Sequence, residues 1–398
     1  MTRWTSALRS ASLLVAGGLL AVLGMGCTSS EPTTPTPQDP PPEPGPTLSL
    51  LYTTPEDGLV LHDARRDTSR TLATDVSAKE ARAVSPSGRY VAFSYATADS
   101  SHLALLDLTT QTLQPVYAVA GPATYSLAWH PDQDQLAFGH YHPTENGVRG
   151  PGGIHVATSD GTTRDVGCSA AREVLHWLPN GSLATRNDEK LYMVAAEDCA
   201  TQASLDARRM HLIHYAPDGE RAAYVHRELR YDREGEEYVP DSSLVLSGPR
   251  GENTETLFGN ERHVRHLRWS PDGSELAFDV AVQESGHRQL VVYDGSRPIF
   301  LVDPDQTTAD QTHPRWSPSG THIAFTLRTG EEAHAAVRVQ GQTRRLGQTQ
   351  GPVWGWLDER TVVVPGPDSV RVQTLDGTTR FTHPAPATLL HAWSRPAS

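Results

Sequence analysis

The feature that most constrains the fold is a short motif that recurs along the chain. Each copy has an aromatic slot, a turn rich in Pro, Asp and Gly, and an apolar run, as in "RWSPDGSELAF" and "RWSPSGTHIAF". The slot holds Val84, Trp129, Trp177, Tyr215, Trp269, Trp316, Trp356 and Trp393. The slots are separated by 45, 48, 38, 54, 47, 40 and 37 residues. Repeats of about 40–50 residues are typical of four-stranded propeller blades.

The motif also predicts how each blade is built. A first strand ends at the aromatic slot, Pro-Asp-Gly or Pro-Ser-Gly makes a turn, and the apolar run forms an antiparallel second strand. Two further strands complete the sheet. Because neighbouring blades pack face to face, the aromatic side chain fills the space between them. We therefore predict an all-β propeller.

The two ends of the predicted propeller complement each other. "LSLLYTT", at residues 48–54, matches a second strand and has no first strand before it. "TLLHAWS", at residues 388–394, matches a first strand with nothing after it. Pairing these two strands closes the ring and removes open sheet edges. This arrangement gives eight blades over residues 48–398, or seven if the degraded repeat at Trp177 or Trp356 is not a blade.

The repeats resemble the TolB-type (PD40/WD40-type) propeller repeat of bacteria, whose core is W-S-P-D-G followed by I-A-F. "RWSPDGSELAF" and "RWSPSGTHIAF" are close to this core, whereas "HWLPNGSLAT" and "GWLDERTVVV" depart from it. The resemblance covers residues 48–398 and implies a surface for protein interaction at the mouth of the ring. We expect no N-terminal domain of the TolB kind, so the resemblance does not extend to membership of a Tol system.

The first 27 residues have the pattern of an export signal. Arg3 and Arg9 precede an apolar run at residues 13–23, and "GMGC" ends at Cys27. Small residues before a cysteine resemble a bacterial lipoprotein signal, which implies a signal peptide at 1–26 and lipid attachment at Cys27. The usual leucine three places before the cysteine is Gly24 here. An ordinary secretory signal and an uncleaved anchor are the alternatives.

A proline-rich segment completes the N-terminal region at residues 27–47. It has almost no large apolar side chains, so it cannot form a core, and we expect an extended stalk. We therefore expect an exported protein held by lipid on a bacterial membrane, at the outer membrane or on the periplasmic face of a membrane.

Charge and motifs narrow the function classes. The formal net charge of −13 disfavours a nucleic-acid or anionic-membrane surface. The sequence contains no G-x-S-x-G, H-E-x-x-H, C-x-x-C or P-loop motif. His140 and His142 have the spacing of a metal pair, but His140 shares a repeat position with His226 and Tyr95, which favours packing between blades. We expect no metal, no cofactor and a binding protein rather than an enzyme.

A basic arc is the strongest candidate for a binding site. The position before the aromatic slot holds His176, His214, Arg268 and Arg315 in four consecutive repeats, and Ala or Gly in the others. His266 and His313 lie two positions earlier, on the same predicted face of the strand. Since first strands line the centre of a propeller, these side chains predict a pocket for a carboxylate, phosphate or acidic peptide. The alternative is that a wide, wet channel tolerates any polar residue.

Two further features are weaker. The insertion at residues 228–241 carries Tyr231 and Tyr238, which are candidate contact residues on a loop over one mouth of the ring. Export permits a disulfide between Cys168 and Cys199. Our strand assignment places these cysteines at opposite ends of adjacent blades, which disfavours the bond.

Together these features predict a monomeric envelope lipoprotein that binds a protein or a cell-wall-associated ligand at the channel mouth. The alternative function is a propeller-type lyase or hydrolase that acts on a polyanionic sugar or a small molecule. A close group of histidines and a carboxylate at the centre of the ring would favour the enzyme.

Overall fold

The computed structural model describes residues 47–395, except 55–57, 65, 75–76, 145–148, 233–236, 260–262, 283–285, 302–308, 367–368 and 385–387. The predicted signal peptide, Cys27 and the stalk up to residue 46 lie outside these ranges. Contacts group Gly45–Ser398 into one compact unit. Within the described ranges, no helix is long and apolar enough to cross a membrane.

The described residues form β-strands joined by turns. In chain order, the strands are β1 (Thr47–Thr54), β2 (Gly58–Asp63), β3 (Thr68–Ala73), β4 (Ser77–Val84), β5 (Tyr90–Ala96), β6 (Ser100–Asp107), β7 (Thr112–Ala120), β8 (Thr124–Trp129), β9 (Gln135–Pro143), β10 (Arg149–Thr158), β11 (Thr163–Asp165), β12 (Glu173–Trp177), β13 (Ser182–Arg186), β14 (Lys190–Ala195), β15 (Thr201–Asp206), β16 (Met210–Tyr215), β17 (Ala222–Asp232), β18 (Glu237–Ser247), β19 (Glu255–Phe258), β20 (Arg265–Trp269), β21 (Leu276–Ala281), β22 (Arg288–Tyr293), β23 (Pro298–Phe300), β24 (Asp310–Trp316), β25 (Ile323–Thr329), β26 (Glu332–Val339), β27 (Gln342–Gln348), β28 (Gly355–Asp358), β29 (Thr361–Pro365), β30 (Ser369–Thr374), β31 (Thr379–Pro384) and β32 (Thr388–Arg395).

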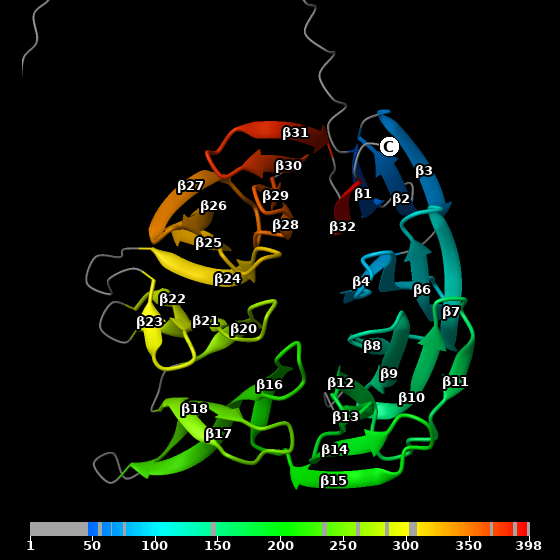
Figure 1. Cartoon of the computed structure of the whole chain (residues 1–398), viewed down its shortest axis with the longest axis vertical. Coiled ribbons are helices and arrows are strands. Elements are labelled where there is room, and N and C mark those ends of the chain that lie inside the picture. Colours follow the sequence, from blue (N-terminus) through cyan, green and yellow to red (C-terminus); the bar gives the residue numbers. More distant parts are fainter. Residues whose placement is uncertain are drawn as a thin grey trace, which may run out of the picture. The chain divides into compact units, whose positions relative to one another are not determined.

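The strands form eight antiparallel four-stranded sheets, which are the blades of a β-propeller. In seven of the sheets, four consecutive strands pair in order, as in β4–β5–β6–β7. The blades surround a centre, with first strands such as β8 and β20 nearest to it and fourth strands such as β7 and β15 at the periphery (Figure 1). The all-β prediction and the blade count of eight are confirmed, and both degraded repeats form blades.

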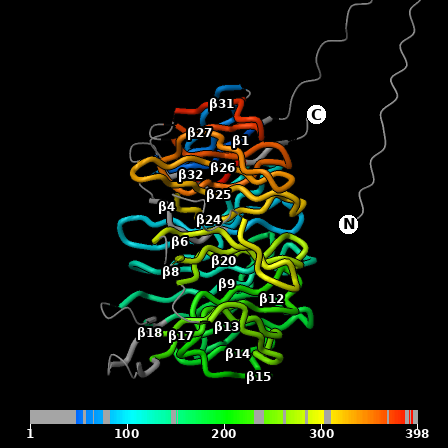
Figure 2. The backbone as a smooth tube through the Cα atoms, turned by 90° about the vertical axis from the view of Figure 1, so that its left-hand side faces the viewer, coloured from blue at the N-terminus to red at the C-terminus, as the bar shows by residue number. Residues whose placement is uncertain are grey.

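The remaining sheet joins the two ends of the ring. Its strand order is β3–β2–β1–β32, and β32 pairs antiparallel with β1, with Ser49 opposite Trp393 and Leu50 opposite Ala392. Figure 1 shows these two strands side by side, and Figure 2 shows the first (blue) and last (red) strands at the same end of the view. β32 also contacts β28 on one side and β4 on the other. The predicted closure by the C-terminal strand is therefore confirmed.

The core lies between neighbouring blades. Phenylalanines of the apolar runs on the second strands, including Phe93, Phe138, Phe278 and Phe325, have no more than 1% of their surface exposed. Residues of adjacent blades share clusters; for example, Ile154 on β10 packs in the same cluster as Trp177 on β12. Because both faces of an inner sheet are covered in this way, second strands such as β5 and β21 are buried along most of their length rather than at alternate residues.

The aromatic slot has a hydrogen-bonding role in addition to its packing role. The indole Nε1 of Trp177 donates to the carbonyl of Ala128, the residue just before the slot of the preceding blade, over 2.9 Å. Trp269, Trp316 and Trp356 repeat this bond to the carbonyls of His214, Arg268 and Arg315. Each of these tryptophans therefore forms a hydrogen bond between its own blade and the first strand of the blade before it.

The turns after the slot have the conformation that the motif predicts. In the turn after Trp269, Gly273 has a φ of +72° and its N–H donates to the carbonyl of Ser270 over 2.9 Å. Glycine reaches this left-handed region without the steric cost that a Cβ would add.

Cys168 and Cys199 form a disulfide, with their Cα atoms 5.3 Å apart. Our placement of the two cysteines at opposite ends of adjacent blades was wrong. β11 has only three residues, so the chain after it remains beside the turn between β14 and β15. The Arg164 guanidinium on β11 donates to the carbonyls of Ala196 and Glu197 in that turn.

Candidate functional site

The four residues of the basic arc that precede the aromatic slot lie on the first strands β12, β16, β20 and β24. Their side chains are all partly buried. The structure joins most of the arc into one group around Arg268, to which His214 on β16 and His313 on β24 are coupled electrostatically. We call Arg268, His214, His266, His313 and Arg315 the arc cluster.

Arg268 lies in the middle of the arc cluster. Its Nη1 donates to the carbonyl of Leu267 over 2.7 Å, and within the described part of the chain it makes no ion pair with a carboxylate. Burial lowers the pKa of the Arg268 guanidinium. Burial and the Arg268 charge together lower the pKa of His214 to about 4, so this imidazole is neutral at pH 7. A partly buried cation without a charged partner is a site that an anion would stabilise.

His266 and His313 are stacked across two neighbouring blades. Their ring centroids are 3.7 Å apart and their planes are inclined by 31°. Burial, followed by the neighbouring His266, lowers the pKa of His313 to about 4; Arg315 and Arg268 act in the same direction. This contact brings together two histidines that are 47 positions apart in the sequence.

The strand geometry at these histidines differs from the expected alternation. His266 has a φ of +52° and His313 a φ of +58°. The pairing register also shifts between Arg265 and Arg268 and between Thr312 and Arg315. The first strands therefore have a bulge here, and the simple two-residue period that we used to place His266 on the face of Arg268 is interrupted. Non-glycine residues in this region of φ are uncommon and occur often at functional sites.

Asp279 is a member of the site that the sequence analysis missed. It lies on β21, has none of its surface exposed, and accepts a hydrogen bond from His266 Nδ1 over 2.5 Å. Arg288 Nε donates to the other carboxylate oxygen, and Arg288 Nη2 donates to the carbonyl of His263 over 2.7 Å. With its Nδ1–H held by Asp279, the His266 ring is fixed in orientation and its Nε2 is left to accept a proton or to meet a ligand.

A signal for Asp279 is present in the repeats. The position after the apolar run holds Ser94, Gly139, Arg186, Val225, Asp279, Thr326 and Pro365 in successive blades. Asp279 is the only carboxylate in that series. A comparison of this second-strand position, made together with the first-strand arc, would have identified it.

Other predicted site residues lie outside the arc cluster. The His176 ring stacks on Tyr215, with centroids 5.6 Å apart and planes inclined by 3°, and burial lowers the pKa of His176. Tyr231 and Tyr238 are opposite each other on β17 and β18. There the two strands continue past the part of β17 that pairs with β16, so these tyrosines belong to a two-stranded extension of their blade.

The His140 region has the features of a packed core. The ring of His140 lies 5.3 Å from that of His155 and 5.2 Å from that of Tyr117, and burial lowers the pKa of His140 to about 4. Glu145, the carboxylate that follows His140 and His142 in the sequence, lies outside the described residues. Across the described ranges, no group of three or more His, Cys, Asp or Glu side chains has an arrangement that would hold a metal ion.

The comparisons with known proteins identify the fold. No protein-family model and no curated relative matches the chain. Dihydro-heme d1 dehydrogenase NirN in complex with DHE has a TM-score of 0.58 and 14% identity, covering 87% of this chain and 74% of that chain. The β-propeller domain of the Trilobed protease from Pyrococcus furiosus has a TM-score of 0.50 and 14% identity, covering 78% and 96%.

A TolB is also among the structural neighbours. The protein from Acinetobacter baumannii has a TM-score of 0.43 and 13% identity, covering 87% of this chain and 82% of that chain. At such identities, likeness to a solved structure reports the arrangement of strands and not the chemistry of a site. The eight four-stranded sheets, together with the likeness to the propeller domain of the Trilobed protease, show that the chain is a β-propeller.

Proposed function

We propose that the protein is a non-catalytic binding protein whose arc cluster takes an anionic ligand at the centre of the propeller. The observation that carries this proposal is Arg268, a partly buried guanidinium with no carboxylate partner among the described residues. His214 and His313, from the two neighbouring blades, offer further nitrogen atoms beside it. A carboxylate of an acidic protein segment or of a cell-wall-associated ligand would match this group.

The ligand class follows from the geometry of the donors. A guanidinium presents several N–H groups in one plane, which suits the two oxygens of a carboxylate. Donors on three consecutive first strands favour a ligand with more than one anionic group. We therefore propose an acidic peptide segment or an anionic polymer, bound by a protein that acts as a monomer.

The test compares two arginine variants on the full chain with a labelled poly-glutamate peptide as the probe. Arg268→Gln should weaken binding about tenfold or more, because one charge-assisted contact is lost. Arg344→Gln, which removes the same charge from the exposed outer strand β27, should leave binding within about twofold, because only the long-range field changes. The melting temperature of Arg268→Gln should be unchanged or higher, since an unpaired buried cation is removed. A clear drop in melting temperature with binding intact would refute the proposal.

A second candidate function rests on the His266–Asp279 pair. A histidine held by a buried carboxylate through Nδ1 can act as a general base through Nε2. This favours a lyase or hydrolase for a polyanionic sugar, in which the arginines would hold the carboxylates of the substrate. Turnover of polygalacturonate by the parent and not by His266→Asn would establish the enzyme, whereas binding without turnover would favour the binding protein.

We also propose that the propeller is exported and anchored to a bacterial membrane by a lipid on Cys27. The apolar run at residues 13–23 and the small residues before Cys27 support this proposal. Detergent partitioning of parent and Cys27→Ala protein tests it, because identical partitioning and mass would rule out lipidation.

A further inference from the structure

A cavity lies away from the arc cluster. Its volume is about 620 Å³, and it is lined by the end of β15 and its connection to β16, by β16 and β17, and by the turn between β18 and β19. Cavities of about 300–1,000 Å³ are of the size that takes small molecules. None of the residues of the arc cluster lines it.

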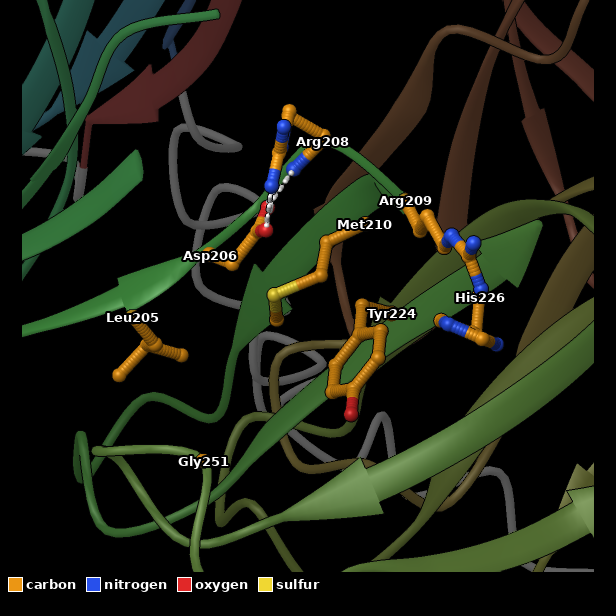
Figure 3. A pocket seen from close by; sticks show the side chains of 8 residues that line it. All are labelled: Leu205, Asp206, Arg208, Arg209, Met210, Tyr224, His226 and Gly251. Carbon is orange, nitrogen blue, oxygen red and sulfur yellow. Dashed lines mark hydrogen bonds and ion pairs between the residues drawn. The ribbon is translucent and has the colours of Figure 1, made fainter. Parts of the chain in front are cut away.

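The cavity has an apolar wall and a polar end. Figure 3 shows Met210 and Tyr224 in the middle, Leu205 at one end, and Arg209 and His226 together at the other. Met210 has 6% of its surface exposed and Tyr224 has 8%. Apolar side chains with a few polar groups at one end are the usual composition of a ligand site.

Tyr224 is the first observation that indicates a ligand. More than nine-tenths of its surface is buried, yet its hydroxyl makes no hydrogen bond within the part of the chain that the structure describes. Burial also raises the pKa of Tyr224, so the hydroxyl keeps its proton and remains a donor. The residue lines the cavity, so its hydroxyl can find a hydrogen-bond partner in a bound molecule.

The exposed ion pair of Arg209 is the second observation that indicates a ligand. Its Nη1 donates to Glu228 Oε2 on β17 over 3.2 Å, and both side chains are about half exposed or more. An exposed pair of this kind is weak, so a ligand carboxylate can replace Glu228 on the guanidinium. Arg208, the neighbouring arginine, is instead held by Asp206 from its own strand connection.

We propose that this cavity binds a small organic carboxylate with an apolar body. Arg209 and His226, at the polar end, would hold the carboxylate, and Tyr224, Met210 and Leu205 would line the apolar part. Glu228 then acts as an internal competitor that occupies Arg209 when the cavity is empty. This site is independent of the anionic ligand proposed for the arc cluster.

The test uses 4-phenylbutyrate and its neutral amide as probes, titrated into the full chain by calorimetry. The carboxylate should bind and the amide should bind at least tenfold more weakly, because the charge-assisted contact to Arg209 is lost. Arg209→Gln should weaken binding of the carboxylate by about tenfold or more, and Glu228→Gln should strengthen it several-fold. If Glu228 only supported the structure, Glu228→Gln would not be expected to bind the carboxylate more tightly.

Arg208→Gln is the matched control, since it removes the same charge from the rim of the same cavity. It should change the affinity by less than about twofold, because Nε and Nη2 of Arg208 both donate to the Asp206 carboxylate, whereas Arg209 gives Glu228 a single contact. Arg268→Gln, in the arc cluster, should have no effect on these probes. Equal affinity for acid and amide, equal losses at Arg208 and Arg209, or no saturable binding of the carboxylate would overturn the proposal.

Discussion

At the scale of single residues, the tryptophans of the aromatic slot join one blade to the next through both packing and a hydrogen bond. The Trp177 indole is 3% exposed and its Nε1 donates to the Ala128 carbonyl. The Trp129 indole is 9% exposed, and its Nε1 is buried with no hydrogen-bond partner among the described residues. Two tryptophans in the same slot of adjacent blades thus differ in this hydrogen bond within the described residues: Trp177 makes it and Trp129 does not.

This difference allows the hydrogen bond to be measured separately from the packing. Trp177→Phe should lower the free energy of unfolding by about 1–3 kcal/mol more than Trp129→Phe, because it alone leaves a buried carbonyl without its donor. Both variants lose the same side-chain volume. Urea denaturation of the two variants provides the comparison. Equal losses of unfolding free energy would show that the hydrogen bond of the indole adds no stability beyond that of packing.

Asp279 constrains the orientation of two other side chains. The buried carboxylate is bonded to both His266 and Arg288. Removal of one member of a buried charged group is costly because the others lose their partner. The residue therefore fixes the position of His266 in the arc cluster without belonging to the first strands that carry the cluster.

At the scale of elements, β32 links regions at the two ends of the sequence. It pairs with β1 and contributes Leu389 and Ala392 to a cluster with Val363 and Val372 of the preceding blade. The C-terminal strand is therefore part of two inter-blade contacts as well as of its own sheet.

Deletion of residues 388–398 should abolish cooperative unfolding or cause aggregation. The deletion leaves the edge of β1 unpaired, and an open edge can pair with other chains. Deletion of residues 396–398 alone is the control, since it lies beyond every pairing of β32. Thermal unfolding followed by circular dichroism measures both, and a sharp transition at the parent temperature in the longer deletion would contradict the role of closure.

At the scale of the whole molecule, several histidines are buried in the neutral form. Burial lowers the pKa of His140, His214 and His313 to about 4, from an ordinary value of 6.5. They lie in three different blades, so the effect is distributed around the ring. Between these two pH values the unfolded chain binds more protons than the folded one.

The protein should therefore lose stability as the pH falls from 6.5 toward 4. Each of these histidines contributes stability that is fully present above the unfolded pKa and is lost below it, up to about 2 kcal/mol at pH 5. The free energy of unfolding, measured by urea titration at pH 7 and pH 5, should fall by a few kcal/mol. His214→Gln should reduce that fall, and an unchanged value between the two pH values would show that these imidazoles are not held neutral.

The sequence by itself determined the architecture, because the blade is a local unit. The aromatic slot, the Pro-Asp-Gly turn and the apolar run each act over a few residues, so their repetition predicted eight blades. The absence of a first strand at the beginning and of a second strand at the end predicted the closure by β32. Four first-strand positions likewise predicted the arc, and the structure brings His214, Arg268 and Arg315 together with His266 and His313.

Tertiary structure alone decided the details of the site and of the disulfide. The stacking of His266 on His313 depends on bulges with positive φ in β20 and β24, which a two-residue alternation does not contain. The bond between Cys168 and Cys199 depends on the shortness of β11. Asp279 reaches His266 across two paired strands. The first two contacts join residues of adjacent blades, and the third joins residues of one hairpin. Their geometry depends on strand lengths and bulges that are set when the strands and blades pack together.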